Sequence, residues 1–167
     1  MHYDMSESRP TYCFDTCSFI GLHRNYPRHV FSSLWDGCEK LIEAGRLFAP
    51  REVLRELEKK DDEILAWAKN FPLIFIEPDA QQLQLVKDIL AKHAGLIDPN
   101  KYIPDADPFV IALALSRRQG LFPSDCQVVT EEKLAGPGGL KIPNVCAAYN
   151  VPCIRLVNVF ELEGWVF

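Results

Sequence analysis

The chain of 167 residues lacks any apolar run near the roughly 18 residues that a membrane-spanning helix needs. Its first ten residues are polar and do not show the basic-then-apolar order of a secretory signal. We therefore expect a cytoplasmic protein with no membrane partner. Residues 1–10 are predicted to be a flexible lead, and residues 11–167 to form a single domain, because no repeat or low-complexity segment divides them.

Metal-binding and redox motifs built on cysteine are also absent. The six cysteines include no C-x-x-C pair, and none has a histidine at zinc-finger spacing. The four histidines show no local pattern that indicates a catalytic base. We interpret the cysteines as small buried side chains in a reducing compartment, with a disulfide or a thiol nucleophile as the alternative. They are Cys13, Cys17, Cys38, Cys126, Cys146 and Cys153.

Glycine-rich phosphate loops are missing as well. Neither G-x-G-x-x-G nor G-x-x-x-x-G-K-[ST] occurs, and the glycines of residues 136–139 do not have either spacing. This leaves a nucleotide-binding α/β domain without support. The formal net charge of −5 argues against a nucleic-acid footprint over the whole surface, although it allows a local basic face.

Short apolar segments alternate with helical patterns along the chain. Strands are predicted at residues 12–15, 46–49, 73–76, 127–130 and 153–156. A helical turn is expected at 18–23, and helices at 32–44, from 50, from 61 or 62, from 79 or 80, and at 108–118, 145–149 and 158–163. Ser32 or Ser33 can cap the second of these helices, and Gly45 fits its end. This alternation favours an α/β fold with a parallel sheet and helices on both faces.

Four acidic residues stand at ends of these elements, and each also has a purely structural interpretation. Asp15 ends the first strand, where it can also form a turn or cap a helix. Glu56 can simply pair with Lys60 one helical turn later. Asp107 precedes Pro108, which is a favourable N-cap arrangement.

The fourth acid is Glu132, which follows Glu131 and Thr130 at a strand end, where both glutamates can be solvated loop residues. The metal-binding interpretation gains strength when the acids are combined. Three of them lie at the carboxyl edge of the predicted sheet, where ligands bind in such folds. Magnesium prefers oxygen ligands, and clustered carboxylates need a cation. The pattern therefore predicts a divalent-cation site.

Four stretches together resemble a known family. They are FDT at residues 14–16, APREVLREL at 49–57, ADPFVIALA at 106–114 and VVTEEK at 128–133. In this order and spacing the chain resembles the PIN-domain nucleases, and most closely a prokaryotic PIN-like subgroup, over residues 11–167. The resemblance implies a three-layer α/β/α sandwich with a central parallel sheet.

The resemblance also implies roles for individual residues. Metal binding and catalysis are assigned to Asp15, Glu56, Asp107 and Glu132, and supporting hydroxyls to Thr16 and Thr130. Glu56 matches the family glutamate in preference to Glu52. Many relatives have aspartate where Glu132 stands, which leaves Glu131 or Asp105 as alternate ligands.

The implied reaction is the hydrolysis of RNA phosphodiester bonds with one or two Mg²⁺ or Mn²⁺ ions and no protein nucleophile. Such proteins are most often toxins of toxin–antitoxin pairs, so an antitoxin or a second copy of the chain is an expected partner. RNA-backbone contacts are predicted for basic residues that are otherwise solvated charges. These residues are Arg24, Arg28, Arg51, Arg55 and Lys133.

Two further expectations concern the rest of the chain. The segment Asp62–Ile103 is longer than one crossover needs and predicts a helical clip, which in this family often meets a partner. Trp35, Trp67 and the tail Trp165–Phe167 are expected in the core. The alternative function is a non-catalytic PIN-like module that binds protein or RNA.

Overall fold

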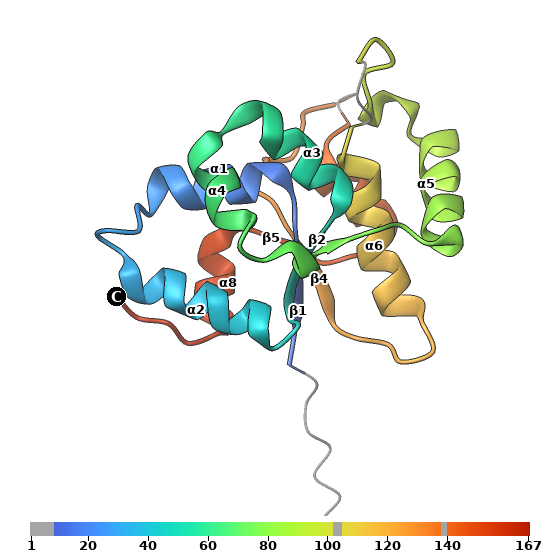
Figure 1. Ribbon diagram of the computed structural model, residues 1–167. Helices are drawn as coiled ribbons and strands as arrows, with labels where there is room; N and C mark the ends of the chain where they lie inside the picture. Colours follow the sequence, from blue (N-terminus) through green and yellow to red (C-terminus); the bar gives the residue numbers. More distant parts are fainter. Residues whose placement is uncertain (1–8, 102–104, 138–139) are drawn as a thin grey trace, which may run out of the picture.

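The computed structural model describes residues 9–101, 105–137 and 140–167. Its sheet has five parallel strands in the order β3-β2-β1-β4-β5, with helices on both faces (Figure 1). The strands are β1 Thr11–Phe14, β2 Leu47–Pro50, β3 Phe75–Ile76, β4 Cys126–Val129 and β5 Cys153–Ile154. The predicted α/β/α sandwich is confirmed. Within the described residues, no helix is both long and apolar enough to cross a membrane.

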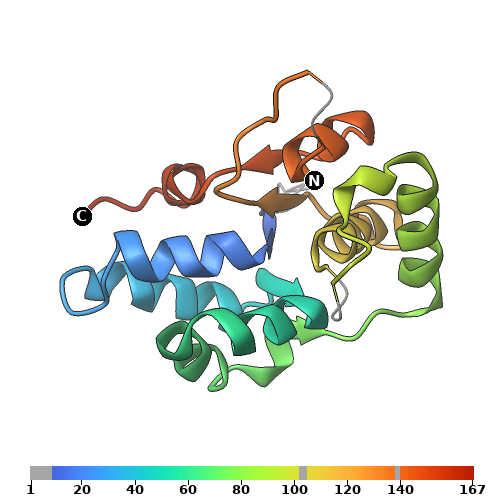
Figure 2. The same cartoon turned by 90° about the horizontal axis from the view of Figure 1, so that it is seen from above.

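The helices form two layers around this sheet. Helices α1–α4 and α8 lie on one side, and α5–α7 on the other (Figure 2). Their bounds are α1 Thr16–Asn25, α2 Ser32–Glu43, α3 Arg51–Lys60, α4 Asp62–Ala68, α5 Ala80–Lys92, α6 Asp107–Gln119, α7 Ile142–Ala148 and α8 Leu156–Leu162. Two 3₁₀ turns, η1 Pro72–Ile74 and η2 Ala94–Leu96, lie in the connections.

The strand order places a switch point between β1 and β4. The chain steps outward from β1 to β2 and β3, then returns to the other side of β1 to form β4 and β5. Connections therefore leave the carboxyl ends of β1 and β4 in opposite directions, and such a switch point is where ligands bind in open α/β sheets. Phe14 pairs with Val129 at the end of this ladder, so Asp15 and Thr130 are the next residues on neighbouring strands.

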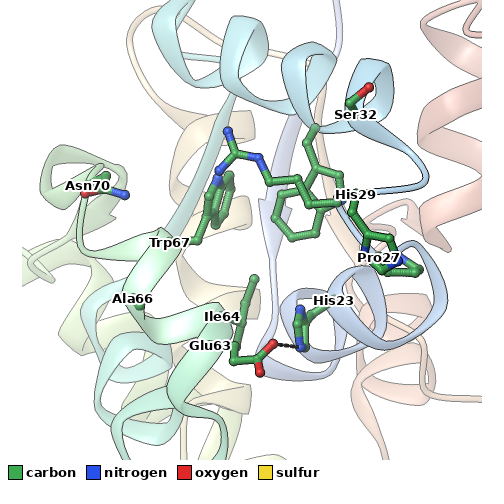
Figure 3. A pocket seen from close by; sticks show the side chains of 11 residues that line it. His23, Pro27, His29, Ser32, Glu63, Ile64, Ala66, Trp67 and Asn70 are labelled. Carbon is green, nitrogen blue, oxygen red and sulfur yellow. Dashed lines mark ion pairs between the residues drawn. The ribbon is translucent and has the colours of Figure 1, made fainter.

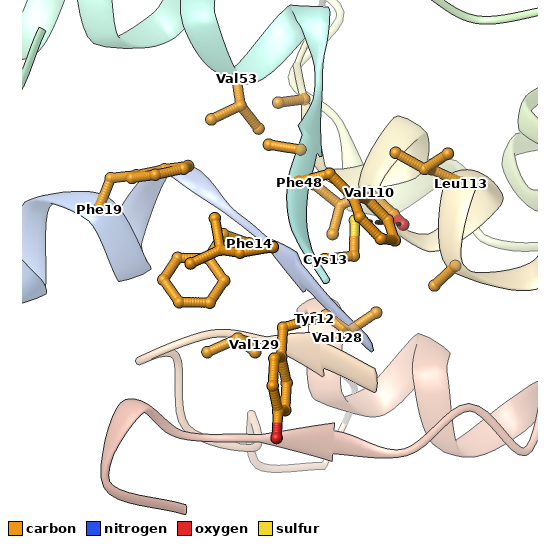
Figure 4. Packing of buried hydrophobic residues seen from close by; sticks show 14 of the residues in the cluster. Tyr12, Cys13, Phe14, Phe19, Phe48, Val53, Val110, Leu113, Val128 and Val129 are labelled. Carbon is orange, nitrogen blue, oxygen red and sulfur yellow. Dashed lines mark hydrogen bonds between the residues drawn. The ribbon is translucent and has the colours of Figure 1, made fainter. Parts of the chain in front are cut away.

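The alternation of side chains along β1 connects both helical layers. Phe14 points to the α1 side, where its ring centroid lies 5.3 Å from that of Phe19, whereas Cys13 points to α6 (Figure 4). The Cys13 thiol donates to the carbonyl of Val110 at 3.6 Å. Successive strand residues face opposite sides of a sheet, so a strand buried on both faces must be apolar throughout. This is why the stretch before Asp15 has no charged side chain, and why the Tyr12 hydroxyl donates a hydrogen bond to Glu163.

Several predicted helix starts are correct because a side chain caps them. Asp61 accepts the amide of Ile64 at 3.2 Å, and Asp79 accepts that of Gln82 at 2.8 Å. The predicted range of α2 is confirmed, but its predicted serine cap was wrong, because Phe31 holds the N-cap position ahead of Ser32. Asp107 was also misplaced as an N-cap, since Ala106 is the N-cap of α6 and Asp107 is its first residue.

Several further boundaries differ from the prediction, among them α7, which begins at Ile142 instead of 145, and α8, which begins at Leu156 instead of 158. Helix α1 spans ten residues instead of a short turn, because the Asp15 carboxylate caps it by accepting the Ser18 amide. The strand expected at 73–76 is confined to Phe75 and Ile76, since Pro72 opens a 3₁₀ turn that contains Leu73. Gly45 does lie just past α2 with a φ of +69°, as expected for a helix end.

The segment Asp62–Ile103 does not form a separate clip in its described part. It supplies α4, the edge strand β3, and α5, which packs along α6 in the second helical layer. Residues 102–104, which include the end of this segment, lie outside the described residues.

The tryptophan expectations are confirmed for Trp35 and Trp67, which are buried and make an edge-to-face contact at 5.0 Å between centroids. The tail is different. Trp165 is half-buried and stacks on Phe160, but Val166 and Phe167 are 93% and 56% exposed, so their predicted core role is wrong.

Gly37 allows Trp165 to approach α2 closely. A Cβ at position 37 would lie 2.8 Å from the Trp165 ring, which is too close for an ordinary contact. We expect Gly37→Ala to lower the free energy of unfolding by about 1–2 kcal/mol, because the forced shift of the ring outweighs the helix propensity gained. Urea unfolding checks this, with Gly37→Ala in a Trp165→Leu background as control. A stabilising effect of the same size in both backgrounds would contradict it.

Candidate metal-binding site

The Asp15 carboxylate is held by three polar groups where β1 meets β4. It is buried at 2% exposure, and its Oδ1 accepts the Ser18 amide at 2.7 Å. The Thr130 hydroxyl donates to Oδ2 in a short hydrogen bond. Asp15 therefore caps α1 with one oxygen and is bound to the end of β4 through the other. Its structural role does not exclude a role as ligand, because each carboxylate oxygen has two lone pairs.

Ser18 adds a constraint on the protonation of Asp15. Its Oγ lies 2.7 Å from Asp15 Oδ1 and 2.6 Å from the carbonyl oxygen of Val129. A hydroxyl has one proton and a carbonyl has none, so only one of these contacts can be a hydrogen bond when Asp15 is charged. A proton on Asp15 would complete both. Burial raises the pKa of Asp15 to about 7. The hydrogen bonds from Thr130 and Ser18 lower this pKa, and the nearby Glu132 charge raises it further, but burial is the largest effect.

Thr130 links Asp15 to Glu132. Its hydroxyl donates to Asp15 and accepts the Glu132 amide at 3.0 Å. The Glu132 side chain in turn accepts the amide of Ile142, the first residue of α7, at 3.3 Å. A chain of hydrogen bonds thus runs from β1 through β4 to the start of α7.

Glu131 and Glu132 point to different places. Glu131 accepts the Leu156 amide at 2.8 Å and the Arg155 guanidinium at 2.8 Å, so it is bound to the start of α8. Glu132 instead lies close enough to Asp15 and Asp107 to raise the pKa of both carboxyls. Of the two candidates left open by the sequence, Glu132 is the one that shares an environment with the other acids.

Asp107 and Glu56 meet at the start of α6. Glu56 accepts the amide of Ala106 at 2.7 Å, and its other oxygen lies 3.5 Å from the Lys60 ammonium. Burial raises the pKa of Asp107 to about 8, and the charges of Glu132, Asp15 and Glu56 add to it. The charges of all three other predicted acids therefore act on the Asp107 carboxyl.

Asp105, the other alternate ligand, is used differently. It pairs with Lys101 and accepts the amide of Asp98 at 2.8 Å, so it closes the loop before α6. Its charge still contributes to the raised pKa of Asp107.

The structure thus gathers Asp15, Glu56, Asp107 and Glu132 at the carboxyl edge of β1 and β4, where their charges oppose one another. Among the described residues, no three His, Cys, Asp or Glu side chains stand close enough to hold one ion directly. The donor set nevertheless fits a hard cation. Mg²⁺ usually keeps several waters and uses only one or two carboxylates, so acids around a hydrated ion need not touch it together.

The hydroxyls have unequal roles. Thr130 binds Asp15, whereas the buried Oγ1 of Thr16 has no hydrogen-bond partner among the described residues. Ser18, rather than Thr16, contacts the Asp15 carboxylate. The sequence does offer a signal for Ser18. It stands three residues after Asp15, and the backbone amide at that position donates to the side chain of an N-cap residue.

Cys17 is a second residue that cysteine spacing did not place at the site. The residue is exposed overall, but its thiol is partly shielded from solvent, and this desolvation together with the charges of Asp15, Glu132 and Asp107 raises the pKa of the thiol to about 12. A thiol in this environment stays protonated and is a poor nucleophile. Its position directly after Asp15 and Thr16 is the only signal that the sequence contains.

The five predicted RNA contacts divide into paired and solvated cations. Arg51 pairs with Glu77, and Arg28 pairs with Glu39 at 3.1 Å. Arg24 and Lys133 are exposed, and Arg55 is half-exposed. Lys133 lines a cavity of about 290 Å³ together with Thr130 and Glu132.

A separate hollow of about 800 Å³ lies between α1, α2 and α4 (Figure 3). Trp67 and Ile64 form part of its wall, and His23 bonds to Glu63 at 2.9 Å on one side. None of the four predicted acids lines it. This hollow is therefore distinct from the acidic site.

A family model matches residues 12–167, which covers both β1 and the tail. The chain belongs to the family described as Domain of unknown function (DUF4411). No curated protein matches the chain. The DUF4411 match extends over every strand and helix that positions the acids, so the acidic edge is part of the family domain.

Proposed function

We propose that this DUF4411 protein is a metal-dependent ribonuclease that hydrolyses RNA phosphodiester bonds with Mg²⁺ or Mn²⁺. One observation carries the proposal. Four carboxylates, from the end of β1, α3, α6 and the loop after β4, lie near the switch point. Burial and the charge of Glu132 raise the pKa of Asp15, and burial and the charges of Glu132, Asp15 and Glu56 raise the pKa of Asp107. Like charges brought together at a cost in stability indicate a ligand that compensates them.

The residues present suit the two tasks that such a reaction requires. Asp15, Asp107, Glu56 and Glu132 would hold the cation and its waters. When bound, the cation would activate a water and offset charge on the phosphate oxygens. Thr130 and Ser18 fix the Asp15 carboxylate, so its free lone pairs keep one direction. No protein nucleophile is needed, which agrees with the raised pKa of Cys17.

Lys133, Arg55 and Arg24 are the proposed backbone contacts, because all three remain outside the ion pairs described above. Arg51 and Arg28 would first have to leave Glu77 and Glu39. The toxin role, a cytoplasmic location, and an antitoxin or second copy as partner remain parts of the same proposal that rest on the resemblance to PIN-domain nucleases.

A second candidate function is a non-catalytic PIN-like module. The observation in its favour is that no three donors among the described residues approach one ion directly. This module would bind RNA or protein without cleaving it. Divalent cations would then leave RNA intact, although the folded protein would still bind its partner.

The neighbouring glutamates provide a matched test. We expect wild-type protein to cleave single-stranded RNA with Mn²⁺ and to stop in EDTA. Glu132→Gln should lower the rate by on the order of 10–100-fold, because one member of the ligand set and its fixed waters is lost. Glu131→Gln should change the cleavage rate by no more than a few-fold, because the Glu131 side chain binds Arg155 and the first amide of α8. A fluorescent RNA cleavage assay measures all three.

Equal rates in the two variants would contradict the assignment of Glu132. Cleavage that persists in EDTA would contradict metal dependence. RNA left intact by folded wild-type protein with either ion would favour the binding module.

A further inference from the structure

Two cysteines meet beside the acidic site. Cys146 lies in the last turn of α7 and is fully buried, and Cys153 is the first residue of β5 and is half-buried. Their thiols are in hydrogen-bonding contact, and this contact, with burial, raises the pKa of the Cys146 thiol. Both are reduced in the structure.

The backbone holds the two residues in fixed places. The Cys146 carbonyl accepts the amide of Val151 at 3.0 Å, which closes the turn after α7, and Asn150 adopts a positive φ of 55° within that turn. Cys153 pairs with Val128 of β4 in the sheet. Helix α7 and strand β5 therefore lie side by side (Figure 2). A contact between thiols on two neighbouring segments is a geometry from which a disulfide forms.

Solvent reaches this pair from one side. Cys153 lines the cavity of about 290 Å³ that Thr130, Glu132 and Lys133 also line, whereas Cys146 is buried and does not line it. A small hydroperoxide fits this cavity and would meet Cys153 first. The other thiols offer no such arrangement: Cys13 and Cys126 are buried, and Cys17 stands exposed among carboxylates.

We propose that Cys153 and Cys146 form a reversible thiol–disulfide pair that small hydroperoxides oxidise through this cavity, and that the bond shifts α7 relative to Glu132. In the first step the Cys153 sulfur attacks the peroxide, which yields a sulfenic acid on Cys153 and releases water or an alcohol. In the second step the Cys146 thiol condenses with the sulfenic acid: the S–S bond forms, the S–H bond of Cys146 and the S–OH bond of Cys153 break, and the proton and hydroxyl leave together as one water. A dithiol reductant reverses the reaction.

The connection to the acidic site runs through α7. Its first amide, that of Ile142, donates to Glu132, and Cys146 lies one turn later on the same short helix. A disulfide needs its sulfurs about 2.05 Å apart, so bond formation pulls α7 toward β5. This movement loosens the bond between Ile142 and Glu132. The consequence for RNA cleavage rests on the proposed function, whereas the disulfide itself does not.

The test uses wild-type protein treated with hydrogen peroxide, followed by alkylation under denaturing conditions and tryptic digestion. Cys146 and Cys153 share one tryptic peptide, residues 142–155. We expect this peptide to be unalkylated and lighter by two hydrogen atoms, and to recover both alkyl groups after dithiothreitol. Cys13 and Cys126 should remain alkylatable. Cys146→Ala should leave a sulfenic acid on Cys153 that dimedone traps.

A peptide 142–155 that stays fully alkylated at peroxide levels that oxidise Cys17 would overturn the proposal. Trapping of sulfenic acid on Cys146 in a Cys153→Ser variant, at the wild-type rate, would overturn the order of attack. Amide hydrogen exchange measures the second part: residues 142–145 should exchange faster in the oxidised protein. Unchanged exchange would overturn the coupling to Glu132. If the reduced protein cleaves no RNA, only the proposed function fails.

Discussion

Asp107→Asn is expected to remove cation-dependent RNA cleavage while making the cation-free protein more stable. Burial and the charges of Glu132, Asp15 and Glu56 raise the pKa of Asp107 to about 8, so its carboxylate opposes folding at neutral pH. One unit of pKa displacement corresponds to about 1.4 kcal/mol. We expect the neutral amide to add about 1–3 kcal/mol, or roughly 3–10 °C in melting temperature.

The same substitution should lower the cleavage rate by roughly 10²–10³-fold, the usual cost of losing one electrostatic contact in a reactive site. Mn²⁺ should reverse the order of stability, because a ligand at about 100 times its Kd stabilises the native state by about 2.7 kcal/mol and the variant binds it poorly. Thermal unfolding with EDTA and with Mn²⁺ measures this. A variant less stable than wild type in both conditions would show that Asp107 is structural.

Asp105→Asn is the matched control for this experiment. Asp105 stands two residues away and also carries a negative charge, but it pairs with Lys101 and closes the loop at Asp98. Its substitution should cost stability in EDTA and leave cleavage within a few-fold of wild type. In EDTA, the stability changes of Asp107→Asn and Asp105→Asn should have opposite signs. This would distinguish a carboxylate that opposes folding from one that supports it.

Glu163→Ala is expected to produce the largest loss of stability. Glu163 pairs with Arg46 and accepts the Tyr12 hydroxyl at 2.6 Å, and the side chains of the ion pair are only 13–14% exposed. Removing one partner of a buried pair leaves the other charge uncompensated, which costs about 3–5 kcal/mol. Chemical unfolding measures this. Glu161→Ala, at an exposed position two residues earlier in α8, should change stability by less than about 0.5 kcal/mol.

The same pair predicts a dependence on pH. Burial by itself would raise the pKa of Glu163, but the hydrogen bonds from Arg46 and Tyr12 and the guanidinium charge outweigh it, so the pKa is lowered. The stabilisation is therefore fully present above the unfolded pKa of about 4.3 and is lost as pH falls through the lower folded value. The difference between wild type and Glu163→Gln should shrink below about pH 4. A difference that grows on acidification would contradict this sign.

The fold was predictable where local chemistry and burial agree. The apolar stretch before Asp15 must be a strand buried on both faces, and Asp61 and Asp79 start helices because their side chains bind free amides. The wrongly predicted helix caps arise where tertiary packing decides which residue holds the N-cap position. Phe31 packs against the core and holds the N-cap position of α2 ahead of two serines that could serve as caps.

The candidate site shows the same division. The four acids could be located because strand ends in a parallel sheet share one edge. The direction of each side chain could not be derived from the sequence. Glu131 turns to α8 because Arg155 and the Leu156 amide lie there, and these residues are more than twenty positions away along the chain. The contact between Cys146 and Cys153 also depends on how α7 folds back onto β5.

The pairing of β1 with β4 has a consequence for the protein during its synthesis. The centre of the sheet is incomplete until residues 126–129 have been synthesised, because they form one ladder with residues 11–14. A nascent chain that has extruded only β1, β2 and β3 has Asp15 without Thr130, and Glu56 without Asp107 or Glu132. The ribosome therefore releases most of the polypeptide before the acidic edge can assemble, and the order of translation itself delays any chemistry that this edge performs.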